Sequence, residues 1–235
     1  MLERVDKLIV SQGQYSRSEV KALVSRRRVL VDGVAIRSSS EKVDPDTARI
    51  VVNGAELVFK RNVYLMLHKP QGYVSATEDK SQATVLELVP EEYRGRELFP
   101  AGRLDKDTTG LMIITDDGAM AHRILSPKKH VQKVYLVEID VPMSPEMVSG
   151  FAAGVALNDG VCQEAKLEIT GSHTGIVTLR EGRYHQIKRM FGCFGGKVTR
   201  LHRLAMGNLF LPEDLPEGEC RELNEEELKL LQQIQ

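Results

Sequence analysis

Residues 102–115 read Gly-Arg-Leu-Asp-Lys-Asp-Thr-Thr-Gly-Leu-Met-Ile-Ile-Thr. Turn-forming and charged residues fill this stretch as far as Gly110, and the apolar run that follows, Leu111 to Ile114, predicts a buried strand. Asp105 is therefore an acid placed just before a core strand, and it is the best candidate in the chain for a chemically active group. An aspartate beside threonine and glycine more often forms a turn or caps a helix, so its role depends on other segments.

Short apolar runs on both sides of this stretch predict further strands. They are expected at residues 63–67, 111–115, 134–139 and 176–179. Between them, Lys69-Pro70-Gln71-Gly72-Tyr73 predicts a rigid turn. This pattern predicts an α+β fold in which the larger domain has a mixed, largely antiparallel sheet flanked by helices.

Two helices are expected in the second half of the chain. The first carries apolar residues at helical spacing and ends at Gly195-Gly196. Its apolar residues are Tyr184, Ile187, Met190 and Phe191. The second begins at Asn224, which Glu227 partners in a capping box. It is expected to dock through Leu228, Leu231 and Ile234.

The front of the chain has a different pattern. Val5, Leu8 and Ile9 recur at helical spacing, and Ser16-Arg17-Ser18-Glu19 is a capping box that opens a second helix. Asp32-Gly33 and Asn53-Gly54, each between short apolar runs, predict two tight hairpins. We therefore predict a small domain over residues 1–58 and a larger domain over residues 62–235, with a linker at about 59–61.

The formal net charge of −1 hides two basic segments. Residues 183–203 contain basic side chains and no acid, at Arg183, Lys188, Arg189, Lys197, Arg200 and Arg203. On the second helix a basic face is formed by Arg17, Lys21 and Arg28, which Arg26 and Arg27 extend. Such a face can follow the phosphates of a nucleic acid, although a solvated helix surface without a ligand is the plain alternative.

Composition narrows the class of protein further. The three cysteines lie far apart without a C-x-x-C pair, which supports neither a disulfide framework nor a zinc site. No apolar run reaches the roughly 18 residues of a membrane span, and Met1 to Val10 contains Glu3 and Asp6 instead of a signal-peptide core. We expect a cytoplasmic protein that does not contact a membrane.

Three segments together resemble the motifs of the RsuA branch of the RNA pseudouridine synthases. They are Gly-Arg-Leu-Asp-x-Asp-Thr-Thr-Gly around Asp105, Lys-x-Tyr-Leu-Val around Tyr135, and Gly-Arg-Tyr-His-Gln-Ile-Lys-Arg-Met at residues 182–190. The helix pair and hairpins at the front, with Arg-Arg-Val-Leu-Val-Asp-Gly at residues 27–33, resemble the S4 RNA-binding domain. Asp-Thr-Thr-Gly-Leu followed by Thr115-Asp116-Asp117-Gly118 is most similar to the small-subunit enzymes of the branch.

The resemblance implies isomerisation of a uridine in small-subunit (16S) ribosomal RNA to pseudouridine, with uridine 516 as the target. In the family's mechanism Asp105 attacks the nucleotide at the sugar C1′, and Tyr135 lines the target base and takes a proton from the sugar. Without the motif, Tyr135 would be read as a packed strand aromatic. No metal or other cofactor is implied. The implied partner is ribosomal RNA in an assembling small subunit, bound by a monomer, and large-subunit ribosomal RNA is the alternative substrate.

A buried carboxylate also needs a cation, because desolvation raises its pKa and would leave it protonated. We predict Arg183 as that cation and Lys188 as the second choice, and both could instead contact RNA phosphates. Arg103 is expected to take the place of the flipped base, or else to form a structural ion pair. His185 and Gln186 are expected to be structural or to contact RNA. Further RNA contacts are expected at Arg17, Lys21, Arg26, Arg28, Lys128, Lys129, Lys133, Lys188, Arg189, Arg200 and Arg203.

Two other functions compete with this one. Asp105-Lys106-Asp107-Thr108-Thr109 also satisfies D-x-D-x-T, the nucleophile motif of magnesium-dependent phosphatases of the haloacid dehalogenase type. That chemistry needs the motif at the end of a buried strand, whereas Pro100 and Gly102 interrupt the residues before it. A ribosome assembly factor that binds RNA without catalysis is the other alternative, and the intact set of Asp105, Tyr135 and Arg183 argues against it.

Overall fold

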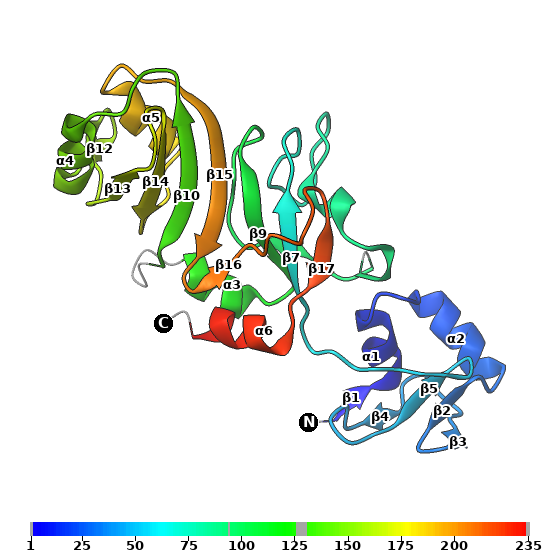
Figure 1. Ribbon diagram of the computed structural model, residues 1–235. Helices are drawn as coiled ribbons and strands as arrows, with labels where there is room; N and C mark the ends of the chain where they lie inside the picture. Colours follow the sequence, from blue (N-terminus) through cyan, green and yellow to red (C-terminus); the bar gives the residue numbers. More distant parts are fainter. Residues whose placement is uncertain (1, 94, 126–130, 234–235) are drawn as a thin grey trace. The chain divides into compact units, whose positions relative to one another are not determined.

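A computed structural model describes residues 2–93, 95–125 and 131–233. The chain forms two compact units (Figure 1). Unit 1 contains residues 1–63 together with residues 89–98, and unit 2 contains residues 64–88 and 99–235. Each unit has its own apolar core.

Unit 1 contains the helix pair and the two hairpins expected from the sequence. Its elements are β1 (Glu3–Arg4), α1 (Val5–Ser11), α2 (Arg17–Ser25), β2 (Val29–Val31), β3 (Val34–Ala35), β4 (Lys42–Val43), β5 (Ile50–Val52), β6 (Ala55–Glu56) and the 3₁₀ turn η2 (Glu91–Tyr93). Strands β3, β2, β5 and β6 form an antiparallel sheet in that order, and β1 pairs with β4. Helices α1 and α2 bury apolar side chains in a core shared with this sheet.

Local sequence signals explain these elements. Ser16 caps α2 by accepting a hydrogen bond from the Glu19 backbone N–H, and the Glu19 carboxylate accepts one from the Ser16 backbone N–H. Asp32 and Asn53 have φ values of 50° and 52°, and the glycine after each also has a positive φ. These are the dihedral angles of type I′ hairpin turns, so the predicted capping box and both hairpins are confirmed.

Residues 89–98 belong to unit 1 although the sequence analysis assigned them to the larger domain. Arg96 holds this segment, because its guanidinium donates hydrogen bonds to the Gln12 side chain and to the carbonyl oxygens of Lys60 and Arg61. Gln12 in turn accepts a hydrogen bond from the Lys60 backbone N–H. No periodic pattern marks such an excursion, because the segment is held by individual polar contacts.

Unit 2 is built on one large sheet. Its elements are β7 (Tyr64–Lys69), the 3₁₀ turn η1 (Val85–Leu88), β8 (Phe99–Pro100), β9 (Thr109–Thr115), α3 (Gly118–Leu125), β10 (Lys133–Ile139), α4 (Pro145–Ala153), β11 (Ala156–Leu157), β12 (Gly160–Val161), β13 (Lys166–Ile169), β14 (Thr174–Leu179), α5 (Gln186–Gly192), β15 (Val198–Met206), β16 (Leu209–Phe210), β17 (Cys220–Glu222) and α6 (Glu225–Gln232). The sheet order is β13-β14-β10-β15-β9-β7-β17, with β16 on β15 and β8 on β9.

The sheet is mixed and largely antiparallel, as predicted. Only β9 and β15 pair in parallel among the described strands, and they pair at just two positions, Thr109 with His202 and Gly110 with Arg203. Beyond Gly110 the two strands separate (Figure 1). Because a parallel pair needs a crossover, residues remote in sequence meet at this point of the sheet.

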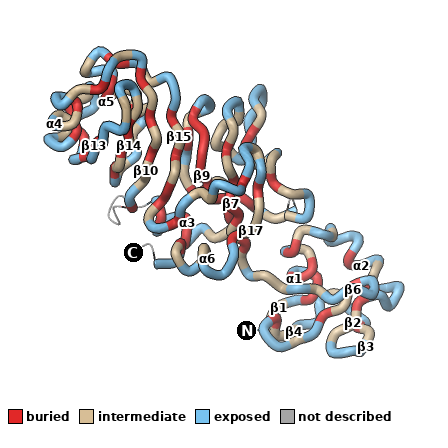
Figure 2. The backbone as a smooth tube through the Cα atoms, in the orientation of Figure 1, coloured by how far each residue is buried: buried red, intermediate tan, exposed pale blue. Residues whose placement is uncertain are grey.

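The core follows the middle strands, where buried segments cluster (Figure 2). Every residue of β9 is buried, as expected of a strand covered on both faces. Helices α4 and α5 lie at the end of the sheet that contains β13 and β14, and α3 and α6 lie beside β16 (Figure 1). The Asn224 capping box and the burial of Leu231 confirm the predicted last helix, while Ile234 lies outside the described residues. No helix in the described part of the chain is long and apolar enough to cross a bilayer.

Candidate active site

Asp105 lies in the loop between β8 and β9, and three segments of unit 2 hold that loop. The Ser75 hydroxyl donates to the Leu104 carbonyl oxygen and accepts from the Leu104 N–H. The Gly72 N–H donates to the Lys106 carbonyl oxygen at 2.9 Å. The turn after β7, predicted from Lys69-Pro70-Gln71-Gly72-Tyr73, therefore supports the loop that carries the acid.

Lys69 is the third support and is fully buried at 0% exposure. Its ammonium donates to the carbonyl oxygens of Pro70, Lys106 and Thr108 at 3.0, 3.4 and 2.9 Å. Burial lowers the pKa of Lys69 to about 8, against the opposing effect of the nearby Asp107 and Asp105 carboxylates. The three donors of an ammonium thus match three backbone acceptors, one in the turn after β7 and two in the loop just after Asp105.

A row of paired residues crosses the sheet beside this loop. Tyr135 on β10 pairs with Arg203 on β15, Arg203 pairs with Gly110 on β9, and Gly110 pairs with Lys69 on β7. Directly paired residues share one face of a sheet. Tyr135, at 8% exposure, therefore lies in the same row and on the same face as the lysine that supports the Asp105 loop.

The Asp105 carboxylate is partly exposed and has two cationic or potentially cationic neighbours. The Lys188 ammonium lies 3.0 Å from Asp105 Oδ2, and His185 Nε2 lies 3.5 Å from Oδ1. Lys188 also lies 2.5 Å from the Asp107 carboxylate. Burial alone would lower the pKa of Lys188, but its bonds to Asp107 and Asp105 raise it above the usual value. Lys188 therefore stays charged at neutral pH.

These groups line an open pocket of about 450 Å³. Its walls are formed by Gln71, Gly72, Asp105, Lys106, Asp107, His185 and Lys188. The volume lies within the usual range for small-ligand sites. An ionised carboxylate beside a fixed ammonium in such a pocket can act as a nucleophile or as a base. Among the described residues, no group of three His, Cys, Asp or Glu side chains is placed to hold a metal ion.

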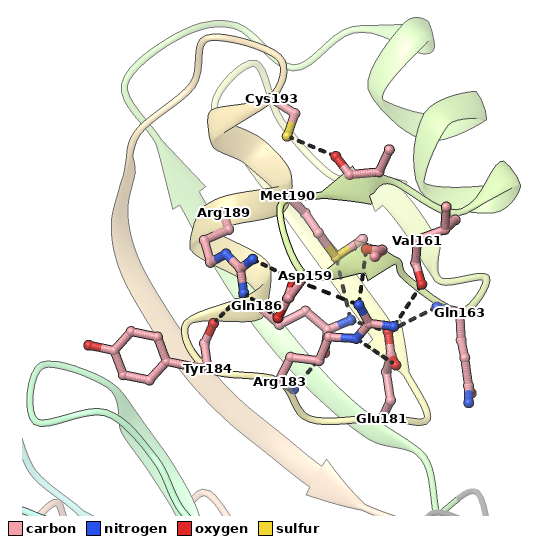
Figure 3. Close-up of polar contacts among 12 residues, drawn as sticks. Asp159, Val161, Gln163, Glu181, Arg183, Tyr184, Gln186, Arg189, Met190 and Cys193 are labelled. Carbon is pink, nitrogen blue, oxygen red and sulfur yellow. Dashed lines mark hydrogen bonds and ion pairs between the residues drawn. The ribbon is translucent and has the colours of Figure 1, made fainter.

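The prediction that Arg183 is the cation beside Asp105 is wrong. The Arg183 guanidinium bonds the Glu181 carboxylate and the carbonyl oxygens of Gly160 and Val161 (Figure 3). Its role is to fix the loop before α5 against the β12 hairpin. Lys188, the second choice, occupies the predicted place, because it lies one turn into α5 and faces back toward the Asp105 loop.

The loop before α5 differs from the sequence prediction in a second respect. Tyr184 was expected on a helix with Ile187, Met190 and Phe191, but α5 begins only at Gln186. Tyr184 lies before the helix and is 73% exposed, whereas the three other residues are buried as predicted. The reason is His185, whose left-handed backbone, with φ 47° and ψ 36°, interrupts any helix there.

Several predicted RNA-contacting cations are already engaged. Arg203 is 2% exposed and donates from Nε to the Leu111 carbonyl oxygen, so its prediction as a phosphate contact is wrong. This bond links β15 to β9 one residue beyond their last paired position, Gly110 with Arg203. Arg189 is ion-paired with Asp159, and Arg200 is ion-paired with Glu138.

Other predicted cations remain accessible. Lys133 is half-buried, and burial together with the nearby Arg203 lowers its pKa. Lys128 and Lys129 lie outside the described residues. Within the described part of the chain, the exposed cations without a hydrogen-bond or ion-pair partner include Arg17, Lys21, Arg26, Arg28 and Arg103.

The sequence analysis missed two supporting residues, Lys69 and Ser75, whereas Gln186 was expected to be structural or to contact RNA and does bond Glu181 and the Arg183 backbone. The signal available for Lys69 was a lysine at the end of an apolar strand with a proline after it. Ser75 offers no comparable signal, because it acts only through two hydrogen bonds with Leu104, which is distant in sequence.

Comparison with known proteins agrees with the two-part structure. Residues 63–192 match the family described as RNA pseudouridylate synthase, and residues 3–48 match the S4 domain. The chain is 46% identical to a Bacillus subtilis protein named "uncharacterized RNA pseudouridine synthase", over 99% of each chain. It is 41% identical to the ribosomal small subunit pseudouridine synthase A of Escherichia coli and to that of Salmonella typhimurium, over 96% of this chain and 98% of each relative.

A solved structure titled "Crystal structure of pseudouridylate synthase" shares the fold with a TM-score of 0.69 and 37% sequence identity, covering 97% of this chain and 99% of the other. The predicted S4-like domain, the mixed sheet and the enzyme class are thereby confirmed. The phosphatase alternative finds no support in these matches. The chain belongs to the RsuA branch of the RNA pseudouridine synthases, enzymes that isomerise uridine in RNA.

Proposed function

We propose that this enzyme converts a uridine of small-subunit ribosomal RNA to pseudouridine, with Asp105 as nucleophile and Lys188 as its cationic partner. The observation that carries this assignment is the 3.0 Å contact between the two side chains in an open pocket of about 450 Å³. An ammonium at this distance places a positive charge directly against the carboxylate that would attack the sugar.

The reaction balances without a co-reactant. A carboxylate oxygen of Asp105 bonds to C1′ of the ribose while the bond from C1′ to N1 breaks, and the uracil leaves with the bonding electron pair. The uracil turns in the pocket, C5 bonds to C1′, and the carboxylate is released. The proton lost from C5 is matched by the proton that N1 gains, so the product is an isomer of the substrate.

The remaining site residues support this sequence of steps. The ammonium of Lys188 stabilises the carboxylate both before attack and when it leaves. Tyr135 is proposed to line the base. Its burial in the row with Arg203 and Lys69 is consistent with a fixed position on the sheet face of the lysine that supports the Asp105 loop. Arg103, exposed and two residues before Asp105, is proposed to fill the space that the flipped uridine vacates.

The substrate assignment rests on the relatives and on charge. Two relatives that are 41% identical over nearly their whole length are named for the small ribosomal subunit. We assign RNA capture to unit 1, whose α2 carries exposed cations, and catalysis to unit 2, so that residues 89–98 fall outside the catalytic part of the predicted domain 62–235. Uridine 516 of an assembling subunit is the proposed target, and a monomer in the cytoplasm the proposed form.

The nucleophile is tested with Asp105→Asn. The variant should bind a transcript of small-subunit ribosomal RNA with the Kd of the parent and form no pseudouridine, because an amide neither attacks C1′ nor leaves from it. Binding is measured by filter retention and product by mass spectrometry of digested RNA. Asp214→Asn, a change at an exposed acid remote in sequence from the site, is the matched control and should react like the parent. Residual turnover by Asp105→Asn would refute the assignment.

The target is tested by mapping pseudouridines in ribosomal RNA from cells with and without the gene. We expect one small-subunit position to be unmodified in the deletion strain and to be restored by the parent gene but not by Asp105→Asn. A missing position in large-subunit RNA would instead establish the alternative substrate. An unchanged map of both RNAs would contradict the proposed function.

A further inference from the structure

An exposed aromatic pair stands at the rim of the Asp105 pocket, and the steps proposed above do not use it. The rings of Tyr184 and His185 are stacked, with centroids 3.9 Å apart and planes 18° from parallel. His185 also lines the pocket and places Nε2 3.5 Å from the Asp105 carboxylate. Tyr184 is 73% exposed, so the ring face that His185 does not cover is open to solvent.

The loop that displays Tyr184 is held firmly on its inner side. Arg183 bonds Gly160 and Val161, and Gln186 bonds Glu181 and accepts from the Arg183 backbone N–H. The carbonyl oxygen of Tyr184 itself accepts a hydrogen bond from Arg189 at 3.1 Å. Figure 3 shows the Tyr184 ring pointing away from this network. Its backbone is fixed while its side chain makes no hydrogen bond within the described part of the chain.

His185 belongs both to the aromatic pair and to the catalytic pocket, and its backbone is strained. His185 adopts a left-handed conformation that costs a non-glycine residue free energy, and its side chain does not cap α5 in return. In that conformation one ring contacts both Tyr184 and the Asp105 carboxylate. Strain of this kind persists where the surrounding structure enforces it and is concentrated at functional sites.

The surroundings favour a nucleobase as the occupant of the open ring face. Charged side chains adjoin the pair, since Arg189 bonds the Tyr184 carbonyl oxygen and Lys188 contacts the same Asp105 carboxylate as His185. An exposed aromatic ring among cations is how proteins hold single-stranded RNA, since each base presents a face for stacking. A protein partner would require a contiguous apolar patch around the tyrosine.

We propose that Tyr184, supported from behind by His185, stacks on a base that flanks the target uridine in the opened RNA strand. This inference deepens the proposed function and rests on it, because the strand is placed there by entry of the target into the Asp105 pocket. Tyr184 acts in substrate binding. Bond breaking at C1′ does not involve it.

The first test compares Tyr184→Ala with Tyr184→Phe on transcribed small-subunit ribosomal RNA. Tyr184→Ala should raise KM by roughly five- to a hundredfold, the range that stacking of one base on an aromatic ring provides. Its single-turnover rate at saturating RNA should match the parent, and Tyr184→Phe should match the parent in both quantities. Phe210→Ala, a change at a 63% exposed aromatic on β16, is the matched control. A Tyr184→Ala enzyme with the KM of Phe210→Ala would overturn the proposal.

A second test does not depend on turnover. A short oligouridylate that carries one 2-aminopurine is titrated with each protein, and stacking is detected as quenching of its fluorescence. Parent and Tyr184→Phe should quench, and Tyr184→Ala should not, while thermal unfolding of all three is equal because the residue is exposed. Equal quenching by Tyr184→Ala would refute Tyr184 as the stacking platform for the base.

The two proposals fail in distinguishable ways. If the parent forms pseudouridine while Tyr184→Ala binds and quenches like the parent, the stacking platform is refuted and the enzymatic function stands. If quenching depends on Tyr184 while the parent forms no pseudouridine in ribosomal RNA, the platform is supported as an RNA contact and the proposed function is refuted.

Discussion

At Asp105 the decisive contact is made by a lysine one turn into a helix, and the arginine of the same motif is used elsewhere. The sequence pointed to the acid, because the motif around Asp105 occurs together with two others, around Tyr135 and at residues 182–190. It also identified the basic segment that supplies the cation. It wrongly favoured Arg183 over Lys188, because the choice depends on the left-handed backbone of His185, which no periodicity indicates.

The role of Lys188 leads to the first residue-scale prediction. Lys188→Met should reduce kcat roughly a hundredfold, the effect of removing one stabilising electrostatic partner. Single-turnover rates provide the measurement, and Lys188→Arg should retain a larger share of the rate.

Arg183→Met is the contrasting variant. It removes bonds to Gly160 and Val161 and should lower stability, with a smaller loss of kcat in the folded enzyme than Lys188→Met causes. If folded Arg183→Met lost more of its kcat than Lys188→Met, the assignment of the two cations would be reversed.

Lys69 gives a second residue-scale prediction. Above pH 8 the buried amine loses its proton and can donate to only two of its three carbonyl acceptors, so the Asp105 loop should loosen and kcat should fall. Lys188 cannot cause this limb, since its pKa is raised above the usual lysine value. Lys69→Met should lack the limb and have a lower, flatter profile. A basic limb that survives in Lys69→Met must arise from another group.

The same titration should affect stability in the opposite sense. The unfolded chain binds the Lys69 proton more tightly than the folded protein does, because the folded pKa of about 8 lies below the ordinary value of 10.5. The free energy of unfolding should therefore rise between those two pH values by about 3 kcal/mol at most. Urea unfolding across this window, with Lys69→Met as the reference, measures the effect.

At the scale of elements, the candidate site depends on the short parallel contact between β9 and β15, which brings segments remote in sequence together. Apolar runs were sufficient to predict β7, β9, β10 and β14 within a few residues, because each is a buried strand bounded by turn residues. The parallel pairing was not predictable, since it depends on strands far apart in the chain and on only two residue pairs. Arg203 was predicted to contact RNA because of its charge. It is instead buried and bonds the Leu111 carbonyl oxygen of β9.

Gly110 sets how closely these two strands approach. It has φ 107°, and a Cβ atom placed on it would lie 2.3 Å from the Arg203 carbonyl oxygen. Gly110→Ala should therefore destabilise the enzyme by about 2–4 kcal/mol through overpacking and backbone strain. Gly118→Ala, at the start of α3 with no atom within 4 Å of the added Cβ, is the matched control and should be neutral or slightly stabilising. Equal midpoints in urea for the two variants would contradict this account.

At the scale of the whole molecule, the basic side chains of α2 and those of residues 183–203 differ in whether they are paired with acids. The acidic and basic residues nearly cancel in number, yet the cations of α2 in unit 1 have no acidic partner within the described part of the chain. Several basic residues of the segment 183–203 are paired with acids. Sequence alone showed where the basic residues are concentrated, but pairing depends on contacts such as Arg189 with Asp159 that the fold creates.

The cations of α2 and of its C-cap, Arg26, lead to a prediction about the salt dependence of RNA binding. Replacing Arg17, Lys21 and Arg26 together with glutamine should weaken binding to small-subunit ribosomal RNA and reduce the slope of log Kd against log salt by about one for each lost phosphate contact. The rate at saturating RNA should not change. Arg49→Gln, at a cation paired with Glu56 in the same unit, is the control and should leave the slope unaltered. An unchanged slope in the triple variant would remove α2 from the RNA-binding surface.

The excursion of residues 89–98 into unit 1 has a consequence for protein engineering. The N-terminal module is encoded in two separated stretches, so a fragment cut after residue 63 would leave behind the guanidinium that binds Gln12, Lys60 and Arg61. Transplanting the module onto another enzyme, or producing it alone, requires both stretches to be moved together.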